Sequence, residues 1–135
     1  MQNEVVRQFF QNYLLIREQG FGAFRREQSK LLSPDLVTVV SDTRGTFTYH
    51  GIDEFFEGMI AWSRHYFVNG KTRHEFVQEM PENVFVQMHG ELRLLEAVNG
   101  ATHSGEDDHE WTEEFELSDG LITRFEVELF FHQPA

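Results

Sequence analysis

One acidic residue late in the chain, Glu113, has neighbours that suit a carboxyl group to acid–base chemistry. Polar and apolar residues alternate over 108–118 as they do in a half-buried strand, where side chains two apart share a face. The face that holds Glu113 also holds His109, Trp111, Phe115 and Leu117, and the opposite face holds Thr112, Glu114 and Glu116. A carboxyl group buried among aromatic rings has a raised pKa. We therefore expect Glu113 to be neutral and able to donate a hydrogen bond.

Histidine is the second residue type here that could move a proton. The seven histidines are His50, His65, His74, His89, His103, His109 and His132. A histidine backed by a carboxylate can act as a base, and His74 and His89 fall on adjacent predicted strands. No pair has the i, i+4 helical spacing of a metal motif, and the chain has no cysteine. We therefore predict no metal site and no cofactor.

Helices and strands must bring these side chains together. Apolar spacing predicts a helix from Glu4 to Gly20 and further helices at about 21–32 and 52–66. Strands are predicted at about 36–40, 46–49, 71–80, 83–97, 108–118 and 121–132. Along the last strand, alternation turns Phe125 and Val127 inward and Ile122 outward. Early helices followed by a long antiparallel sheet are typical of an α+β fold with helices on one face.

Length and charge narrow the class of protein further. A chain of 135 residues predicts a single domain over 1–135. The net charge of −12 argues against nucleic acid and against an anionic membrane surface as partners. Most of the excess falls after residue 100, where ten acidic residues face one basic residue, Arg124. The chain has no apolar run of membrane-spanning length and does not start like a signal peptide, so we expect a cytoplasmic protein.

Three segments carry a resemblance to a known superfamily. Leu32–Val37 follows a predicted helix that ends at Gly20, Gly51–Phe56 starts another helix, and Trp111–Ile122 forms a closing hairpin. Together they resemble the nuclear transport factor 2-like superfamily, in particular its SnoaL-like branch. The resemblance implies a cone-shaped, cystatin-like α+β roll, in which a curved antiparallel or mixed sheet wraps around N-terminal helices and leaves an apolar pocket. It also implies homodimers formed through the open sheet face.

Ketosteroid isomerase, a member of this superfamily, is the relative whose site residues this chain resembles. Tyr13 matches its tyrosine, Asp42 matches its base, and Glu113 matches its acid donor. The resemblance implies that Asp42 removes a proton from the substrate while Tyr13 and Glu113 donate hydrogen bonds to the enolate oxygen. Glu113 stands where the isomerase has an aspartate. The chain between Gly20 and Asp42 is longer than in the isomerase, so Asp35 stays open as the alternative carboxylate beside the pocket.

The pocket that the resemblance implies would be lined mainly by aromatic rings. The candidate ligand-binding residues are Phe9, Trp62, Tyr66, Trp111, Phe115 and His109. Such a lining suits a small apolar molecule that carries a carbonyl group. The superfamily includes isomerases, dehydratases and cyclases as well as non-catalytic binders, so the fold does not name the chemistry. We predict a small-molecule-binding SnoaL-like protein that acts as a cofactor-independent isomerase, cyclase or dehydratase; a non-catalytic ligand-binding or dimerisation module is the open alternative.

Overall fold

The computed structural model describes residues 2–42, 45–63, 66–68, 72–94 and 105–129, with side chains at all of these positions except 66–68, 91–94 and 105–108. The helices are α1 (Glu4–Gln11), α2 (Leu14–Glu18), α3 (Phe21–Ser29) and α4 (Gly51–Ser63). The strands are β1 (Leu32–Asp42), β2 (Gly45–His50), β3 (Tyr66–Val68), β4 (Arg73–Glu79), β5 (Asn83–Leu94), β6 (Gly105–Ser118) and β7 (Leu121–Glu128).

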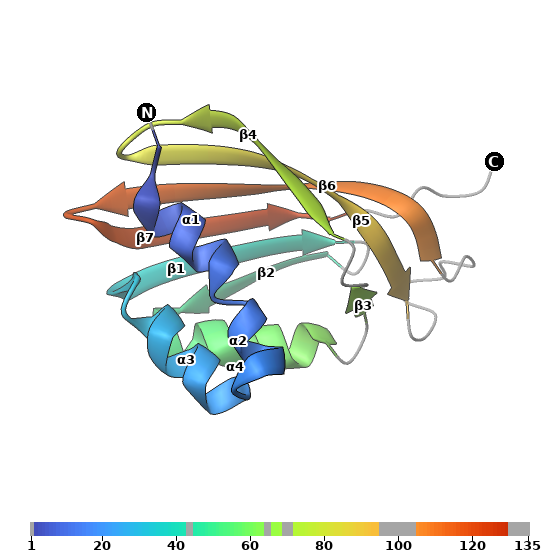
Figure 1. Ribbon diagram of the computed structural model, residues 1–135, viewed down its shortest axis with the longest axis horizontal. Helices are drawn as coiled ribbons and strands as arrows, with labels where there is room; N and C mark the ends of the chain where they lie inside the picture. Colours follow the sequence, from blue (N-terminus) through green and yellow to red (C-terminus); the bar gives the residue numbers. More distant parts are fainter. Residues whose placement is uncertain (1, 43–44, 64–65, 69–71, 95–104, 130–135) are drawn as a thin grey trace.

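These seven described strands form one curved sheet with the helices on its inner side (Figure 1). The strand order is β2-β1-β7-β6-β5-β3, and β4 also pairs with β5. β1 and β7 run parallel, and all other described pairs are antiparallel. The cone-shaped α+β fold with a curved mixed sheet is therefore confirmed. No helix in the described part of the chain is long and apolar enough to cross a membrane.

Phenylalanine rings fill the space between the helices and the sheet. Phe9 of α1 is fully buried, and its ring centroid lies 5.1 Å from that of Phe115 and 5.2 Å from that of Phe125. Phe24 of α3 and Phe56 of α4 are also fully buried, with their centroids 6.0 Å apart. Each buried aromatic side chain contributes roughly 2–3 kcal/mol by removing apolar surface from water. The high phenylalanine content is thus explained by the core.

An ion pair fixes α1 to the edge strand β4. Asn3 caps the helix by accepting a hydrogen bond from the Val6 N–H at 3.1 Å. One turn later, Arg7 donates two hydrogen bonds of 2.7 Å to the two carboxylate oxygens of Glu79. The Arg7 guanidinium lowers the pKa of Glu79 to about 2, chiefly through these hydrogen bonds. The N-terminal end of α1 is therefore anchored at the sheet edge.

The hairpin between β6 and β7 changes the face of one residue. Asp119 and Gly120 form its turn with φ of 53° and 77°, a backbone conformation that favours an Asp-Gly pair. The register shifts beside this turn, between Glu116 and Leu117. Ile122 then pairs with Leu117 and is fully buried. The prediction that Ile122 faces outward was therefore wrong, because strict alternation fails at a β-bulge.

Several element boundaries also differ from the prediction, and β1 begins at Leu32, at the end of the helix predicted over 21–32. The expected helix from Glu4 to Gly20 is divided at Asn12 and Tyr13, where i→i−3 hydrogen bonds replace part of the α-helical pattern. The helix expected to run to Tyr66 ends at Ser63, and Tyr66 begins the short strand β3. β3 pairs with the end of β5, so sheet pairing rather than helix extension decides the backbone there.

Close packing between α4 and β2 depends on a glycine. A Cβ atom placed on the buried Gly58 would lie 2.8 Å from Cζ of the Tyr49 ring. A contact this short forces a side chain to move. Only a residue without a side chain therefore lets α4 lie this close to the tyrosine.

Gly58→Ala should lower the stability of the protein, although alanine normally favours a helix by about 1 kcal/mol. We expect a loss of roughly 1–3 kcal/mol in the free energy of unfolding, because the added methyl group overpacks the contact with Tyr49. Urea denaturation measures this change. Gly22→Ala in α3 is the matched control, since nothing lies within 4 Å of a Cβ there, and it should leave stability equal or slightly higher. A stabilising Gly58→Ala would contradict the packing described.

Candidate functional site

Glu113 lies in a row of inward-facing residues that is otherwise apolar. The pairing of the strands places these residues side by side across the sheet: Phe47, Val40, Val127, Glu113, Val86 and Phe76. Val86 beside Glu113 is fully buried, as is Phe115 two residues further along β6. The predicted face of Glu113 is therefore correct. The carboxyl group meets apolar neighbours on the side of the sheet that the helices cover.

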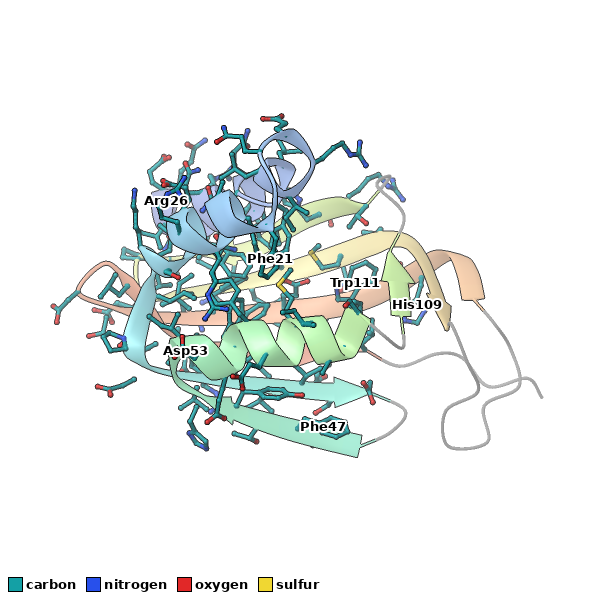
Figure 2. All side chains as sticks on the ribbon, turned by 90° about the horizontal axis from the view of Figure 1, so that it is seen from below. Phe21, Arg26, Phe47, Asp53, His109 and Trp111 are labelled. Carbon is teal, nitrogen blue, oxygen red and sulfur yellow. The ribbon has the colours of Figure 1, made fainter. Side chains whose placement is uncertain are left out.

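The inner face of β6 changes from polar to apolar along the strand. His109, Trp111 and Glu113 are successive inward residues, and Phe115 and Leu117 continue the same face. Trp111 and His109 stack with ring centroids 6.2 Å apart at 23°, at the end of the sheet where β3 lies (Figure 2). The phenylalanine core occupies the apolar end. The polar end is therefore the part of the interior with groups that can do chemistry.

The Glu113 carboxyl group is held by one neighbour on its own strand. Trp111 Nε1 donates a hydrogen bond of 2.9 Å to Glu113 Oε2. Burial raises the pKa of Glu113 to about 7, against the opposing effect of the Trp111 hydrogen bond. Glu113 is partly buried, whereas Trp111 beside it is 7% exposed. A carboxyl group with this pKa can both give and take a proton near neutral pH.

Tyr13 lies in the turn between α1 and α2, on the helix side of the sheet. Its ring packs between two fully buried rings, with centroids 5.6 Å from Phe9 and 5.0 Å from Phe24. Burial raises the pKa of Tyr13, and the nearby negative charge of Glu113 raises it further. The phenol therefore keeps its proton and can act as a hydrogen-bond donor. Tyr13 and Glu113 thus lie on the same inner side of the sheet, near enough for the charge of Glu113 to act on the phenol, and their joint role stays a prediction.

A buried network of amide side chains fixes the backbone turn beside Tyr13. Asn12 Nδ2 donates to Gln28 Oε1 at 2.8 Å, and Gln28 Nε2 donates to the Phe9 carbonyl oxygen at 3.1 Å. Gln28 is fully buried and Asn12 is 3% exposed. Sequence reasoning missed this network, and the only signal for it was two amides on helical faces expected to be apolar. Its role is to hold α3 against the turn that carries Tyr13.

Asp42, rather than Asp35, is the carboxylate of β1 that faces inward. Asp42 is 2% exposed at the end of the strand, while Asp35 is exposed near its start. Asp42 lies two residues beyond Val40, which belongs to the same row as Glu113. The Cα atoms of Asp42 and Glu113 are roughly 12 Å apart, since the path crosses two strand spacings and two residues. Strand β7 therefore separates the two acids on the inner face.

The other candidate residues divide between core and site. Phe9 and Phe115 are fully buried in the phenylalanine core, and Trp62 is half-buried against it. His109 is fully buried beside Trp111. The side chain of Tyr66 lies outside the described part of the chain.

His74 and His89 lie on adjacent strands, as predicted. His74 faces inward from β4 and stacks on Phe10, with ring centroids 4.6 Å apart. His89 follows the outward alternation of β5, and its Nδ1 lies 3.4 Å from Glu110 Oε1. Burial lowers the pKa of His74, and the positive charge of Arg7 lowers it further. The two histidines therefore lie on opposite faces of the sheet.

Charged groups on the outer face do not form a comparable site. A small hollow there is lined by Glu114, Glu116, Arg124 and Glu126, and Arg124 pairs with Glu126 at 3.2 Å. The polar atoms that line this hollow are carboxylates and one guanidinium on the solvent side of the sheet. Within the described residues, no three His, Asp or Glu side chains gather closely enough to hold a metal ion.

Comparisons with known proteins identify the fold. No protein-family model and no curated protein matches the chain. A protein from Mesorhizobium loti, provisionally named a SnoaL-like polyketide cyclase, superposes with a TM-score of 0.64 and 13% identity over 92% of this chain and 95% of its own. A protein from Pseudomonas putida, provisionally named a polyketide cyclase, gives a TM-score of 0.61 and 17% identity over 94% and 90%. An NTF2-like protein from Burkholderia xenovorans gives 0.67 and 14% over 94% and 89%.

Replacing Glu113 by glutamine should remove a pH dependence of stability. The folded protein holds the Glu113 proton up to about pH 7, whereas the unfolded chain releases it near its ordinary pKa of 4.5. The free energy of unfolding therefore falls as the pH rises through this window, by up to about 3 kcal/mol in total. Glu113→Gln should match the wild type near pH 4.5 and be more stable at pH 8, as measured by urea denaturation.

The control for this experiment is Glu116→Gln, which removes a charge from the exposed face of the same strand. The difference in the free energy of unfolding between Glu116→Gln and the wild type should not grow between pH 4.5 and pH 8 as it does for Glu113→Gln. A Glu113→Gln protein with the same pH dependence as the wild type would show that this carboxyl group is ionised in the fold.

Proposed function

Since the chain has the SnoaL-like form of the nuclear transport factor 2-like fold, we propose that it binds a small, mostly apolar carbonyl compound and catalyses its enolisation without a cofactor. The observation that carries this proposal is the Glu113 carboxyl group on the inner side of the sheet, held by the indole of Trp111, with Tyr13 near enough for the charge of Glu113 to raise the pKa of its phenol. The cyclase names of its structural neighbours agree with chemistry at an activated carbon beside a carbonyl group.

Two hydrogen-bond donors suit a carbonyl oxygen. The Tyr13 phenol keeps its proton, and Glu113 in its neutral form offers a second O–H group. A carbonyl oxygen has two lone pairs, and its negative charge grows as an enolate forms. Preorganised donors in a site that excludes water stabilise that charge more than water does. These two residues are therefore assigned to the enolate oxygen.

Asp42 is assigned to the removal of the proton. It is buried on the same inner face as Glu113, and its Cα atom lies roughly 12 Å from that of Glu113 by the strand spacing. The two side chains project from the same inner face, and the proposal places the reacting part of the ligand between them. A base at one end and two donors at the other match an enolisation across a small molecule.

The phenylalanine core limits the size of the ligand. Phe9, Phe115 and Phe125 already fill the apolar end of the interior. The ligand is therefore placed at the polar end, over Glu113 and Trp111. This arrangement favours compact ketones and lactones over long or multi-ring molecules.

Solvent deuterium exchange at the carbon beside the carbonyl group tests the proposed enolisation. A panel of small ketones and lactones is followed by NMR with the wild-type protein and three variants. Asp42→Asn should slow exchange by roughly 10²–10⁴-fold, because it removes the base. Tyr13→Phe and Glu113→Gln should each slow it by roughly 10²–10³-fold, because each removes one donor to the enolate.

Matched controls separate the site from general effects of charge. Asp35→Asn removes an exposed carboxylate from the strand of Asp42, and Glu116→Gln does the same on the strand of Glu113. Both should exchange at the wild-type rate. Equal exchange by Asp42→Asn and the wild type would remove Asp42 as the base. Binding of a panel compound without any exchange would overturn the catalytic proposal and favour the alternative of a non-catalytic binding module.

A further inference from the structure

The two oxygens of Glu113 are not equivalent in the fold. Oε2 accepts the 2.9 Å hydrogen bond from Trp111 Nε1, and no described residue bonds to Oε1. An indole N–H group is a donor only. It therefore always requires an acceptor at Oε2, whichever protonation state Glu113 is in.

Trp111 is itself held firmly in place. Its side chain is 7% exposed and belongs to the core, and its ring stacks on the fully buried His109. Met88 lies directly opposite it on β5 and is 5% exposed. A ring packed on several sides cannot turn its N–H group away from the carboxyl group without opening the core. The hydrogen bond is thus set by packing rather than by a flexible surface contact.

We propose that Trp111 is a positioning residue that gives the two oxygens of Glu113 different tasks. Oε2 serves as the permanent acceptor for the indole, and Oε1 carries the proton of the neutral acid. On ionisation, the proton leaves from Oε1 and the indole hydrogen bond stays. Trp111 therefore orients the reactive oxygen, in addition to any contact that its ring makes with a ligand. The catalytic consequence rests on the proposed function, whereas the assignment of the proton does not.

The electrostatic surroundings of Glu113 support this division of tasks. Among the described residues, the titratable groups on the inner side of the sheet include Tyr13 from the α1–α2 turn, Asp42 from β1, Tyr49 from β2, His74 from β4 and His109 from β6 itself. The residues directly beside Glu113 on β5 and β7 are Val86 and Val127. Burial raises the pKa of Glu113, and the Trp111 hydrogen bond opposes that rise. The indole therefore keeps the titration within the neutral range.

The wild-type protein provides the first test. The chain has two tryptophans, so two indole N–H resonances are expected in a proton–nitrogen correlation spectrum, and Trp62→Phe assigns them. The Trp111 resonance should shift with a midpoint near pH 7 as its acceptor ionises, and the shift should vanish in Glu113→Gln. The Trp62 resonance serves as the internal control. A Trp111 resonance with no titration that depends on Glu113 would overturn the proposal.

Trp111→Phe provides the second test, because it keeps an aromatic ring and removes the donor. The carboxyl carbon of Glu113, labelled with carbon-13 and assigned by Glu113→Gln, reports its titration directly. We expect the midpoint to rise by about one pH unit, since the indole hydrogen bond is stronger to the ionised carboxylate than to the neutral acid. Trp62→Phe removes the other indole and should leave the midpoint unchanged. An unchanged or lower midpoint in Trp111→Phe would overturn the role of Trp111.

Both measurements are made without any ligand, so they are independent of the enolisation assay. A shifted midpoint in Trp111→Phe together with no exchange of any compound would keep the proton assignment and reject the proposed function. Exchange by the wild type together with an unchanged midpoint in Trp111→Phe would keep the proposed function and reject the role of Trp111. Where exchange is measured, the pH–rate profile of Trp111→Phe should move upward with the Glu113 midpoint, which loss of packing alone would not cause.

Discussion

Glu113 places a carboxyl group on the inner face of the sheet, between Val86 and Val127, where the neighbouring strands supply only apolar side chains. Removing this group from water disfavours its charged form, and the pKa of about 7 expresses that cost. A domain with a total stability of about 5–15 kcal/mol can hold such a group only if burial elsewhere offsets it. The rings around Phe9, Phe115 and Phe125 provide that burial at the other end of the same face.

The helices α1 and α3 are held in place by separate contacts on the inner side of the sheet. α1 is anchored by Arg7 and Glu79 at the sheet edge, and its phenylalanines seal the apolar end. The Asn12–Gln28 contact then fixes the turn that carries Tyr13. The buried amides Asn12 and Gln28 are therefore paired with each other beside the candidate site. Phe9 of α1 packs edge-to-face on Tyr13 in the turn that follows the helix, so the position of Tyr13 depends on the packing of Phe9.

Most of the negative charge lies away from this site. Glu114 and Glu126 stand directly opposite each other on the outer face, and Arg124 pairs with Glu126 beside them. Like charges opposite each other on neighbouring strands are destabilising unless a cation lies close by. The homodimer that the resemblance implies stays a prediction. A second copy docked on this face would have to bring further carboxylates against those already present.

The sequence by itself determined the features that depend on neighbouring residues. Alternation placed Glu113 and Trp111 on one face, Asp119 and Gly120 marked the hairpin turn, and three segments together indicated the fold. These signals are readable because backbone geometry repeats every two residues in a strand and every 3.6 in a helix. The same periodicity failed at Ile122, because the extra residue of a β-bulge shifts the alternation by one position.

Only the tertiary structure decided which distant residues meet. Tyr13 and Glu113 stand a hundred residues apart in the chain, and spacing alone could not choose between Asp35 and Asp42. That choice depended on where β1 begins and on its parallel register with β7, which turns Asp42 inward and leaves Asp35 exposed. The buried Asn12–Gln28 contact was likewise absent from any local pattern. Such contacts form because helices and strands pack so that the most apolar surface is buried. The burial of apolar surface depends on the whole chain and not on neighbouring residues.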